Sequence, residues 1–330
     1  MAKLGLVRQP MLLHRRQLLA GSAALLGASI ASRAAIAASY PEKNIEWICM
    51  WRSGGGADVA TRTFTGHLEK ILKKDIVVKN VTGGGGSIGY AAAKVAKPDG
   101  YTLVTLQGDL PKYKPMGQAP IDIGDFDSIA GFAFQSPVVV VRADSPWKTL
   151  QNFVDDAKKN PGKYSVGVTD IGGVFHQPLV LFQALAGFET KAVTFEGSPQ
   201  QTVALLGGHV DALVTWVKPN IPYEKDGKVR FLGYMASERD PAFKQIPTLK
   251  EQGFDQIWQH PYGMGSPRGT PAEVRKVLED AAKKIWEVPE FGASLDKLGL
   301  SVLRMDGAAY EAHLNRMQAD MAKAVALIKN

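Results

Sequence analysis

Short apolar runs alternate with amphipathic segments along residues 45–106. Three strands are predicted, because each run is short, apolar and followed by glycine or turn residues: 45–51, 76–81 and 101–106. Between them, apolar side chains recur at three- and four-residue spacing, which predicts two helices at about 58–73 and 88–96. This β-α-β-α-β order predicts an α/β fold with a parallel, doubly wound sheet that helices cover on both faces.

The apolar run Pro137–Arg142 starts a second α/β series. Helices are predicted near 150–159, 178–186 and 200–206, and strands at 164–168, 192–195, 211–217 and 230–234. Residues 258–266, which contain Pro261, Gly263 and Gly265, lead into Lys- and Glu-rich helices from Pro271 onward. The chain therefore passes between two α/β halves near 135–142 and again near 258–266, and paired crossings commonly form a hinge. We expect domain I at 38–138 plus 262–330, and domain II at 139–261.

The composition describes an ordinary folded protein. Its 330 residues are 45% hydrophobic and 22% charged, which suits two domains with sizeable cores. Five of the charges behind the formal +7 are basic residues within 1–37, a stretch without acidic residues, so the remainder carries +2. That balance favours neither a nucleic acid nor a membrane surface as partner. Cys49 is the single cysteine, so no intramolecular disulfide forms, and its apolar neighbours predict a core position.

Residues 1–37 are typical of an export signal. Arg15-Arg16 precede an uncharged run of 13 residues, Leu18–Ile30, and Ala35-Ile36-Ala37 supplies the small-x-small cleavage pattern. The run is too short to span a hydrocarbon core of ~30 Å. Paired arginines resemble a twin-arginine signal, and an ordinary secretory signal is the alternative. In both cases we expect a periplasmic protein, cleaved near Ala37.

Two glycine-rich loops, 52–57 and 82–87, follow neighbouring predicted strands, and each opens a helix. Ligands of open parallel sheets bind beyond the carboxyl ends of the strands, and the N–H groups at a helix N-terminus attract anions. Glycine also lets the backbone approach a ligand closely. The pair of loops predicts a carboxylate site, with a plain tight turn as the alternative for either loop alone.

Two enzyme motifs overlap the second loop. Gly84, Gly86 and Gly89 fit the dinucleotide fingerprint G-x-G-x-x-G, but the preceding strand ends in the polar pair Lys79-Asn80. Ser87 stands at the centre of a G-x-S-x-G, but four successive glycines make a broad loop where a hydrolase needs a tight, strained turn. An exported dinucleotide-dependent oxidoreductase stays open as an alternative function. Ser87 is better interpreted as a donor to a bound anion or as a helix N-cap.

The remaining polar candidates lie in the second half. The six histidines are scattered without i, i+4 spacing, so we expect no metal, and we expect no cofactor. His176 and Asp170 flank a glycine turn, where each would either contact a ligand or serve as a capping or turn residue. Trp216, at the end of a predicted strand, would either line a cleft or pack in the core.

Several short motifs follow one another along the whole mature chain in a family-specific order. They are Tyr40-Pro41-Glu42-Lys43-Asn44-Ile45, the loops 51–62 and 80–89, Pro98-Asp99-Gly100-Tyr101-Thr102-Leu103, Glu196-Gly197-Ser198-Pro199, 205–211, Ile246-Pro247-Thr248 and Gly269-Thr270-Pro271. In their order and spacing they resemble the extracytoplasmic substrate-binding proteins of tripartite tricarboxylate transporters, the Bug family. No single motif decides this resemblance; the series does.

The resemblance implies a periplasmic-binding-protein-like clamshell of two α/β domains joined by a hinge. Such a protein captures a small organic carboxylate without covalent chemistry, is no enzyme, and delivers the ligand to integral-membrane permease subunits. A ligand-sensing role in a membrane signalling system is the alternative within binding proteins. We expect a monomer.

Position by position, the resemblance also implies the binding residues. They are Trp51, Arg52, Ser53, Gly54, Gly55, Gly84, Gly85, Gly86, Ser87, Gln107, Asp170, His176, Ser198 and Trp216. Arg52 and Ser53 replace two prolines of the family pattern, and Trp216 stands where small or amide residues are usual. These departures favour a ligand that is aromatic, bulky or more highly charged than the usual small dicarboxylates.

Overall fold

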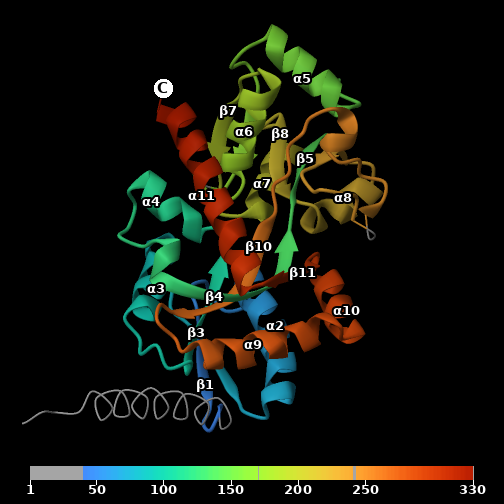
Figure 1. Ribbon diagram of the computed structural model, residues 1–330. Coiled ribbons are helices and arrows are strands. Elements are labelled where there is room, and N and C mark those ends of the chain that lie inside the picture. Colours follow the sequence, from blue (N-terminus) through green and yellow to red (C-terminus); the bar gives the residue numbers. More distant parts are fainter. Residues whose placement is uncertain (1–39, 170, 241–242, 330) are drawn as a thin grey trace, which may run out of the picture.

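The computed structural model describes residues 40–169, 171–240 and 243–329, which form two α/β units stacked one above the other (Figure 1). The first sheet contains β1 (Ile45–Cys49), β2 (Ile76–Asn80), β3 (Thr102–Gln107), β4 (Phe126–Gln135), β10 (His260–Pro267) and β11 (Ser301–Asp306). The second contains β5 (Pro137–Arg142), β6 (Ser165–Val168), β7 (Lys191–Thr194), β8 (Ala212–Trp216) and β9 (Val229–Tyr234). The predicted export signal lies outside the described residues.

The first sheet has the strand order β11-β4-β10-β3-β1-β2. As predicted, β1 runs parallel to both β2 and β3. However, β10 is antiparallel to β3 and β4, and β11 is antiparallel to β4. The prediction of a wholly parallel sheet is therefore wrong for this half, because β10 enters the sheet from the second unit rather than through a β-α-β crossover.

Glycines make the strands β4 and β10 hard to recognise from the sequence pattern. A Cβ atom at Gly263 would lie 2.2 Å from the ring of Tyr310, and one at Gly131 would lie 2.9 Å from the same ring. Both strands therefore need glycine to admit this aromatic side chain, which packs across them. The requirement breaks the apolar alternation on which strand prediction depends.

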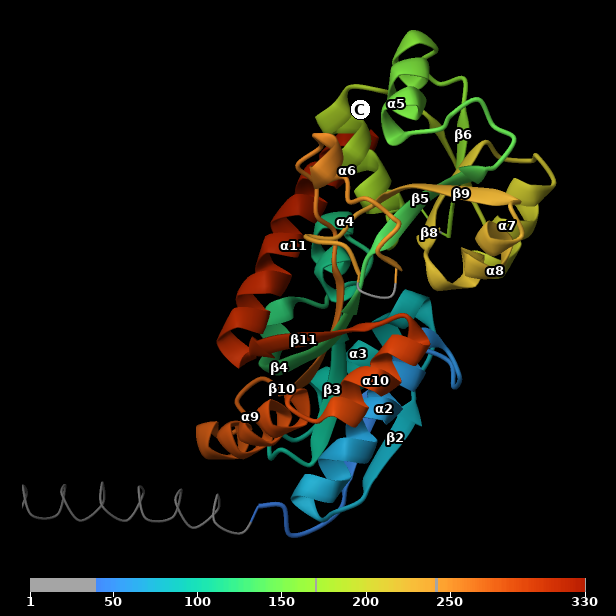
Figure 2. The same cartoon turned by 90° about the vertical axis from the view of Figure 1, so that its right-hand side faces the viewer.

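Helices cover both faces of the first sheet, as predicted (Figure 2). On one face lie α2 (Gly56–Leu72), α9 (Ala272–Trp286) and α10 (Pro289–Leu298), which pack on a core that includes Trp47, Phe64 and the buried Cys49. On the other lie α3 (Ser87–Lys94) and α11 (Gly307–Lys329), packed around Tyr90 and Tyr310. The predicted core position of Cys49 is confirmed.

The second sheet has the order β7-β6-β8-β5-β9. β6 is parallel to β7 and β8, whereas β5 is antiparallel to β8 and β9, so this sheet is mixed as well. The helices α5 (Leu150–Lys159) and α6 (His176–Ala186) cover one face, and α7 (Ser198–Leu206) covers the other. Two further helices are short: α4 (Tyr113–Met116), which follows β3, and α8 (Ile221–Lys225), which follows β8.

The chain passes between the two sheets after β4, which ends at Gln135, and before β10, which begins at His260. The exact domain boundaries stay predictions. α11 is a further connection: Tyr310 and Leu314 lie in the core of the first sheet, whereas Met317 lies in the core of the second. Beyond Met317 the helix continues beside α6 (Figure 1). In the described part of the chain, no helix has both the length and the apolar character needed to cross a membrane.

Candidate functional site

The first glycine loop connects β1 to α2 and is held by one buried carboxylate. Asp58, 2% exposed, accepts hydrogen bonds from the Gly54 amide (2.9 Å), from Arg62 Nε (2.9 and 3.0 Å) and from Asn80 Nδ2 (2.8 Å). The same Asn80 nitrogen donates to the Trp51 carbonyl at 2.8 Å. Because Asn80 ends β2, these bonds tie the first loop to the strand that leads into the second.

The hydrogen bonds also decide the charge of this carboxyl group. Burial alone would raise the pKa of Asp58, but the hydrogen bonds from Arg62, Asn80 and the Gly54 amide outweigh it and lower the pKa below its ordinary value. Asp58 is therefore an anion at neutral pH.

The second glycine loop has a backbone that requires glycine. Residues 83–86 have φ values of +122°, +56°, +62° and +100°, a succession that side chains with a Cβ atom rarely adopt. The loop forms the short 3₁₀ turn η1 (Gly84–Gly86), and the Tyr113 hydroxyl donates to the Gly85 carbonyl at 2.7 Å. Burial, with the nearby Asp109, raises the pKa of Tyr113, so the phenol keeps its proton for this bond.

Ser87 follows this turn as the first residue of α3, and Gly86 is the helix N-cap. The interpretation of Ser87 itself as the N-cap is therefore wrong. Its hydroxyl lies close to the loop, since a Cβ atom at Gly84 would be 2.3 Å from Ser87 Oγ. The alternative role of Ser87, as a donor to a bound anion, stays a prediction.

A third polar segment begins at Gln107, the last residue of β3, which is the one predicted residue in it. Gln107 Nε2 donates to Asp109 Oδ2 at 2.9 Å, and Lys112 Nζ lies 3.7 Å from Asp109 Oδ1. All three side chains are buried. On the adjacent β10, His260 is also buried, and this burial lowers its pKa, so its ring is neutral at pH 7.

In the second unit, the predicted residues lie at the carboxyl ends of strands or at the start of helices. The buried His176 accepts a hydrogen bond from the Gly172 amide at Nδ1 (2.9 Å), and burial lowers its pKa. His176 therefore holds its own glycine turn as a neutral ring. Ser198 is the first residue of α7, and its hydroxyl accepts from Thr215 Oγ1 at 3.2 Å. Asp170 lies outside the described residues.

Trp216 connects the two units through aromatic contacts. Its ring is half-buried and lies 4.6 Å from the Phe175 ring centroid and 5.9 Å from that of His260. His260 in turn lies 5.2 Å from Tyr262. Phe175 and Trp216 belong to the second unit, whereas His260 and Tyr262 lie on β10 of the first, so the row crosses from one sheet to the other.

A cavity of about 340 Å³ lies beside this row and is bounded by both units. Its lining includes Gly56 of the first loop, Gln135 at the end of β4, the segment 216–219 at the end of β8, and Leu298 and Gly299 at the end of α10. The volume is in the range of small-molecule sites. The cavity therefore joins the start of α2 to Trp216, two predicted parts of the site that are 160 residues apart in sequence.

The predicted residues of the two loops differ in their exposure and in their contacts. Trp51 packs beneath the second loop, since a Cβ atom at Gly86 would lie 3.6 Å from Trp51 Cζ2. Arg52 and Ser53 are exposed, as are Gly54, Gly84 and Gly85, while Gly55 is partly buried. Within the described residues, the guanidinium of Arg52 forms neither a hydrogen bond nor an ion pair. A ligand contact by Arg52 stays a prediction.

Sequence reasoning missed the residues that hold the loops in place. Asp58 and Arg62 have the i, i+4 spacing of a helical ion pair beside a glycine loop, which is a usable signal. Tyr113 carries no such signal, because its partner, the Gly85 carbonyl, is distant in sequence.

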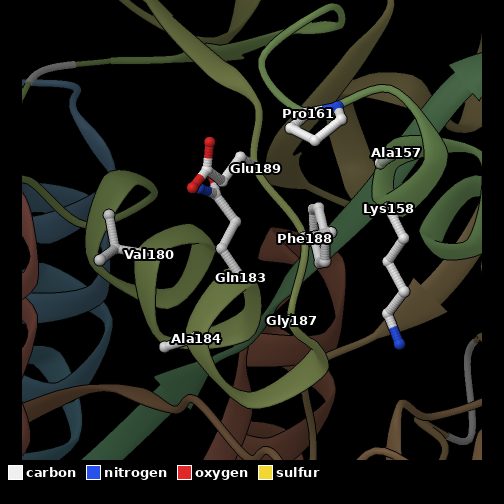
Figure 3. Close-up of a pocket in the computed structure, with 9 residues that line it drawn as sticks. All are labelled: Ala157, Lys158, Pro161, Val180, Gln183, Ala184, Gly187, Phe188 and Glu189. Atoms are coloured by element: carbon white, nitrogen blue, oxygen red, sulfur yellow. The ribbon is translucent and has the colours of Figure 1, made fainter.

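A second cavity, of about 450 Å³, lies in the second unit between α5 and α6 (Figure 3). It is lined by the end of α5, by Pro161, by the last half of α6 and by Phe188 and Glu189. Pro161 and Glu189 precede β6 and β7, so this cavity lies at the amino ends of the strands. Ligands of such sheets bind at the carboxyl ends, and the cavity contains none of the predicted site residues.

In the described part of the chain, no group of three or more His, Cys, Asp or Glu side chains is arranged to hold a metal ion. Two α/β units with glycine loops at their strand ends and a cavity between them form the fold of a two-domain ligand-binding protein. Comparison with known proteins gives the family.

The family described as "Tripartite tricarboxylate transporter family receptor" matches residues 60–330, and this chain belongs to it. A protein from the 5' region of gbd in Cupriavidus necator is 30% identical over 301 residues, 88% of this chain and 89% of that protein. A ligand-free TctC solute-binding protein from Polaromonas is 31% identical with a TM-score of 0.79, covering 87% of this chain and 99% of that one.

Two more distant structures share the fold. MatC from Rhodopseudomonas palustris with bound malate is 24% identical with a TM-score of 0.71, covering 87% of this chain and all of that one. R. palustris Rpa4515 with adipate is 22% identical with a TM-score of 0.72, covering 87% of this chain and 98% of that one. The chain is therefore a solute-binding receptor with the clamshell fold, and the alternative of an oxidoreductase is wrong.

Proposed function

We propose that this protein captures an organic carboxylate in the periplasm and delivers it to the integral-membrane permease subunits of a tripartite tricarboxylate transporter. The observation that carries the proposal is the pair of glycine loops at the ends of β1 and β2. Each loop opens a helix, and Asp58 and Asn80 hold the first loop beside the second. The two helix N-termini offer backbone N–H groups to one anion.

The ligands of the structural relatives agree with this chemistry. Malate and adipate, bound by the two R. palustris proteins, are both dicarboxylates. In the present chain the proposed site is made of the predicted residues of the two loops together with Gln107, His176, Ser198 and Trp216, of which Trp216 lines the cavity. Trp216 and the aromatic row beside it would accommodate the organic part of the ligand.

A thermal-shift screen of organic acids tests the carboxylate proposal. An acid at ~100 times its Kd is expected to stabilise the folded protein by about 2.7 kcal/mol, which raises Tm by several degrees. The uncharged amide of each acid is the control, because it keeps the size and carbon skeleton and lacks the anion. Equal shifts by an acid and its amide, or no shift by any acid, would contradict the proposal.

We further propose that residues 1–37 are a twin-arginine signal. The support is the pair Arg15-Arg16 ahead of the weakly hydrophobic run, and the family is one of periplasmic proteins. Mass spectrometry of the intact periplasmic protein is expected to give the mass of a chain that begins at Ala38. Replacing both arginines by lysine is expected to stop export; continued export of that variant would instead indicate the general secretory route.

A further inference from the structure

Gln107 carries a buried hydrogen-bond acceptor whose orientation is fixed. The residue ends β3 and is 1% exposed. Its amide nitrogen donates to Asp109 Oδ2 at 2.9 Å, and a carboxylate can only accept, so the nitrogen must face Asp109. The amide oxygen, Oε1, then faces away from Asp109. It is buried and has no hydrogen-bond partner among the described residues.

Lys112 strengthens this orientation. Its ammonium lies 3.7 Å from Asp109 Oδ1, and the Lys112 and Asp109 side chains are only 6% and 11% exposed. The carboxylate is thus held between a cation and the Gln107 amide N–H. Reversing the amide would place Oε1 against the anion, which is repulsive. The order Lys112, Asp109, Gln107 therefore leaves one acceptor available at the end of β3.

The neighbours of Gln107 show which face of the sheet its side chain occupies. Gln107 pairs with Tyr262 across the antiparallel β3 and β10, so the two side chains lie on one face. The Tyr262 hydroxyl accepts from Gln135 Nε2 at 2.7 Å and would lie 3.8 Å from a Cβ atom at Gly56. Gly56 and Gln135 both line the cavity of about 340 Å³. The Gln107 side chain therefore lies on the sheet face of Tyr262 and the first glycine loop, one side chain away from the residues that line the cavity.

We propose that Gln107 Oε1 accepts a hydrogen bond from the bound acid, so the protein selects carboxylates that carry a hydroxyl or ammonium group next to the carboxylate. This inference rests on the proposed function and adds the ligand class. A buried acceptor left without a donor is unfavourable, and a site built around such a group rejects analogues that lack the donor. A hydroxyl group supplies the required donor as O–H, and an ammonium group supplies it as N–H.

Matched acids separate this preference from the carbon skeleton, and the hydroxy acids also keep the charge of the unsubstituted acid. Calorimetry would compare three carbon skeletons, each with hydrogen, hydroxyl or ammonium at C2: succinate, malate and aspartate; glutarate, 2-hydroxyglutarate and glutamate; 3-phenylpropionate, phenyllactate and phenylalanine. In the skeleton that binds best, a substituted acid is expected to bind at least 10-fold more tightly than the unsubstituted one. The order of the hydroxyl and ammonium members then identifies the donor.

Two variants test whether Gln107 is the cause. Gln107→Met keeps the length of the side chain without the acceptor, and the 10-fold preference is expected to fall below 3-fold. Asp109→Asn lets the Gln107 amide reverse, and the preference is expected to shrink there too. Gln256→Met is the matched control: Gln256 Oε1 is also buried without a partner in the described structure, but Gln256 Nε2 donates to the Pro178 carbonyl, away from the glycine loops. It is expected to keep the full preference.

The outcomes are distinct. Tight binding of unsubstituted acids with no preference in any skeleton would overturn this inference and leave the proposed function standing. A preference that survives both Gln107→Met and Asp109→Asn would also overturn it. No binding by any of the nine acids would count against the proposed function and this inference together. Thermal melting of each variant, compared with the Gln256→Met control, shows that it is folded.

Discussion

Replacing Gly86 by valine is expected to weaken carboxylate binding at least 100-fold, about 2.7 kcal/mol. Gly86 has a φ of +100°, and a Cβ atom there would lie 2.7 Å from the Tyr113 hydroxyl, which holds the Gly85 carbonyl. A β-branched side chain would both strain the backbone and displace that hydroxyl. The measurement is the calorimetric Kd for the best acid from the thermal-shift screen.

Gly227→Val is the matched control for that experiment. Gly227 also has a positive φ, +67°, and no atom lies within 4 Å of its Cβ position, but it lies in the turn before β9. It should lose stability without losing affinity. Gly85→Val and Gly54→Val should have smaller effects than Gly86→Val, because their Cβ positions are also free of neighbours and only backbone strain remains. If Gly86→Val binds within 3-fold of the wild type, the second loop does not hold the carboxylate.

Asp58→Ala is expected to lower the free energy of unfolding by about 3 kcal/mol and to weaken ligand binding as well. The substitution leaves the Gly54 amide, the Asn80 amide and part of the Arg62 guanidinium without their acceptor. The estimate is modest because Arg62 is 46% exposed and water replaces part of its interaction. Urea unfolding and calorimetry measure the two effects.

Asp144→Ala serves as the comparison, because Asp144 pairs with Arg142 on the surface and is expected to contribute nothing measurable. The effect of Asp58 should also depend on pH. Its pKa is lower in the folded protein than in the unfolded chain, so its stabilising contribution is full above the unfolded pKa of about 4 and is lost as the pH falls further. Asp58→Asn should show a smaller acid-induced loss. An equal loss in wild type and Asp58→Asn would exclude this carboxylate as the cause.

The helices and strands of the second unit were predictable because their signals are local. Each of its predicted helices and strands between 150 and 234 lies within two residues of an observed element. In these segments, apolar periodicity, turn residues and helix starts all favour the same structure. β11 was missed because Ser301–Asp306 alternates weakly and lies between two helices, where a continued helical segment was the simpler interpretation.

The candidate site was predictable only in part, for a related reason. The glycine loops 52–57 and 82–87 can be recognised from their composition alone. The structure confirms that both follow strands and open helices. The groups that fix these loops are set by tertiary contacts. Tyr113 reaches back 28 residues to the Gly85 carbonyl, and Asn80 reaches back 29 residues to the Trp51 carbonyl. No local pattern contains such pairs, so a single sequence cannot supply them.

The continuous helix α11 restricts how the clamshell can open. Its first turns are anchored beneath the glycine-loop sheet through Tyr310 and Leu314, and Met317 is embedded in the opposite core against α6. A rotation about the two strand crossings alone would shear this contact. Opening must therefore either slide α6 along α11 or bend the helix between Leu314 and Met317. The free energy of that step is set by side chains remote from the ligand, and it enters the apparent affinity through the fraction of molecules that are able to bind.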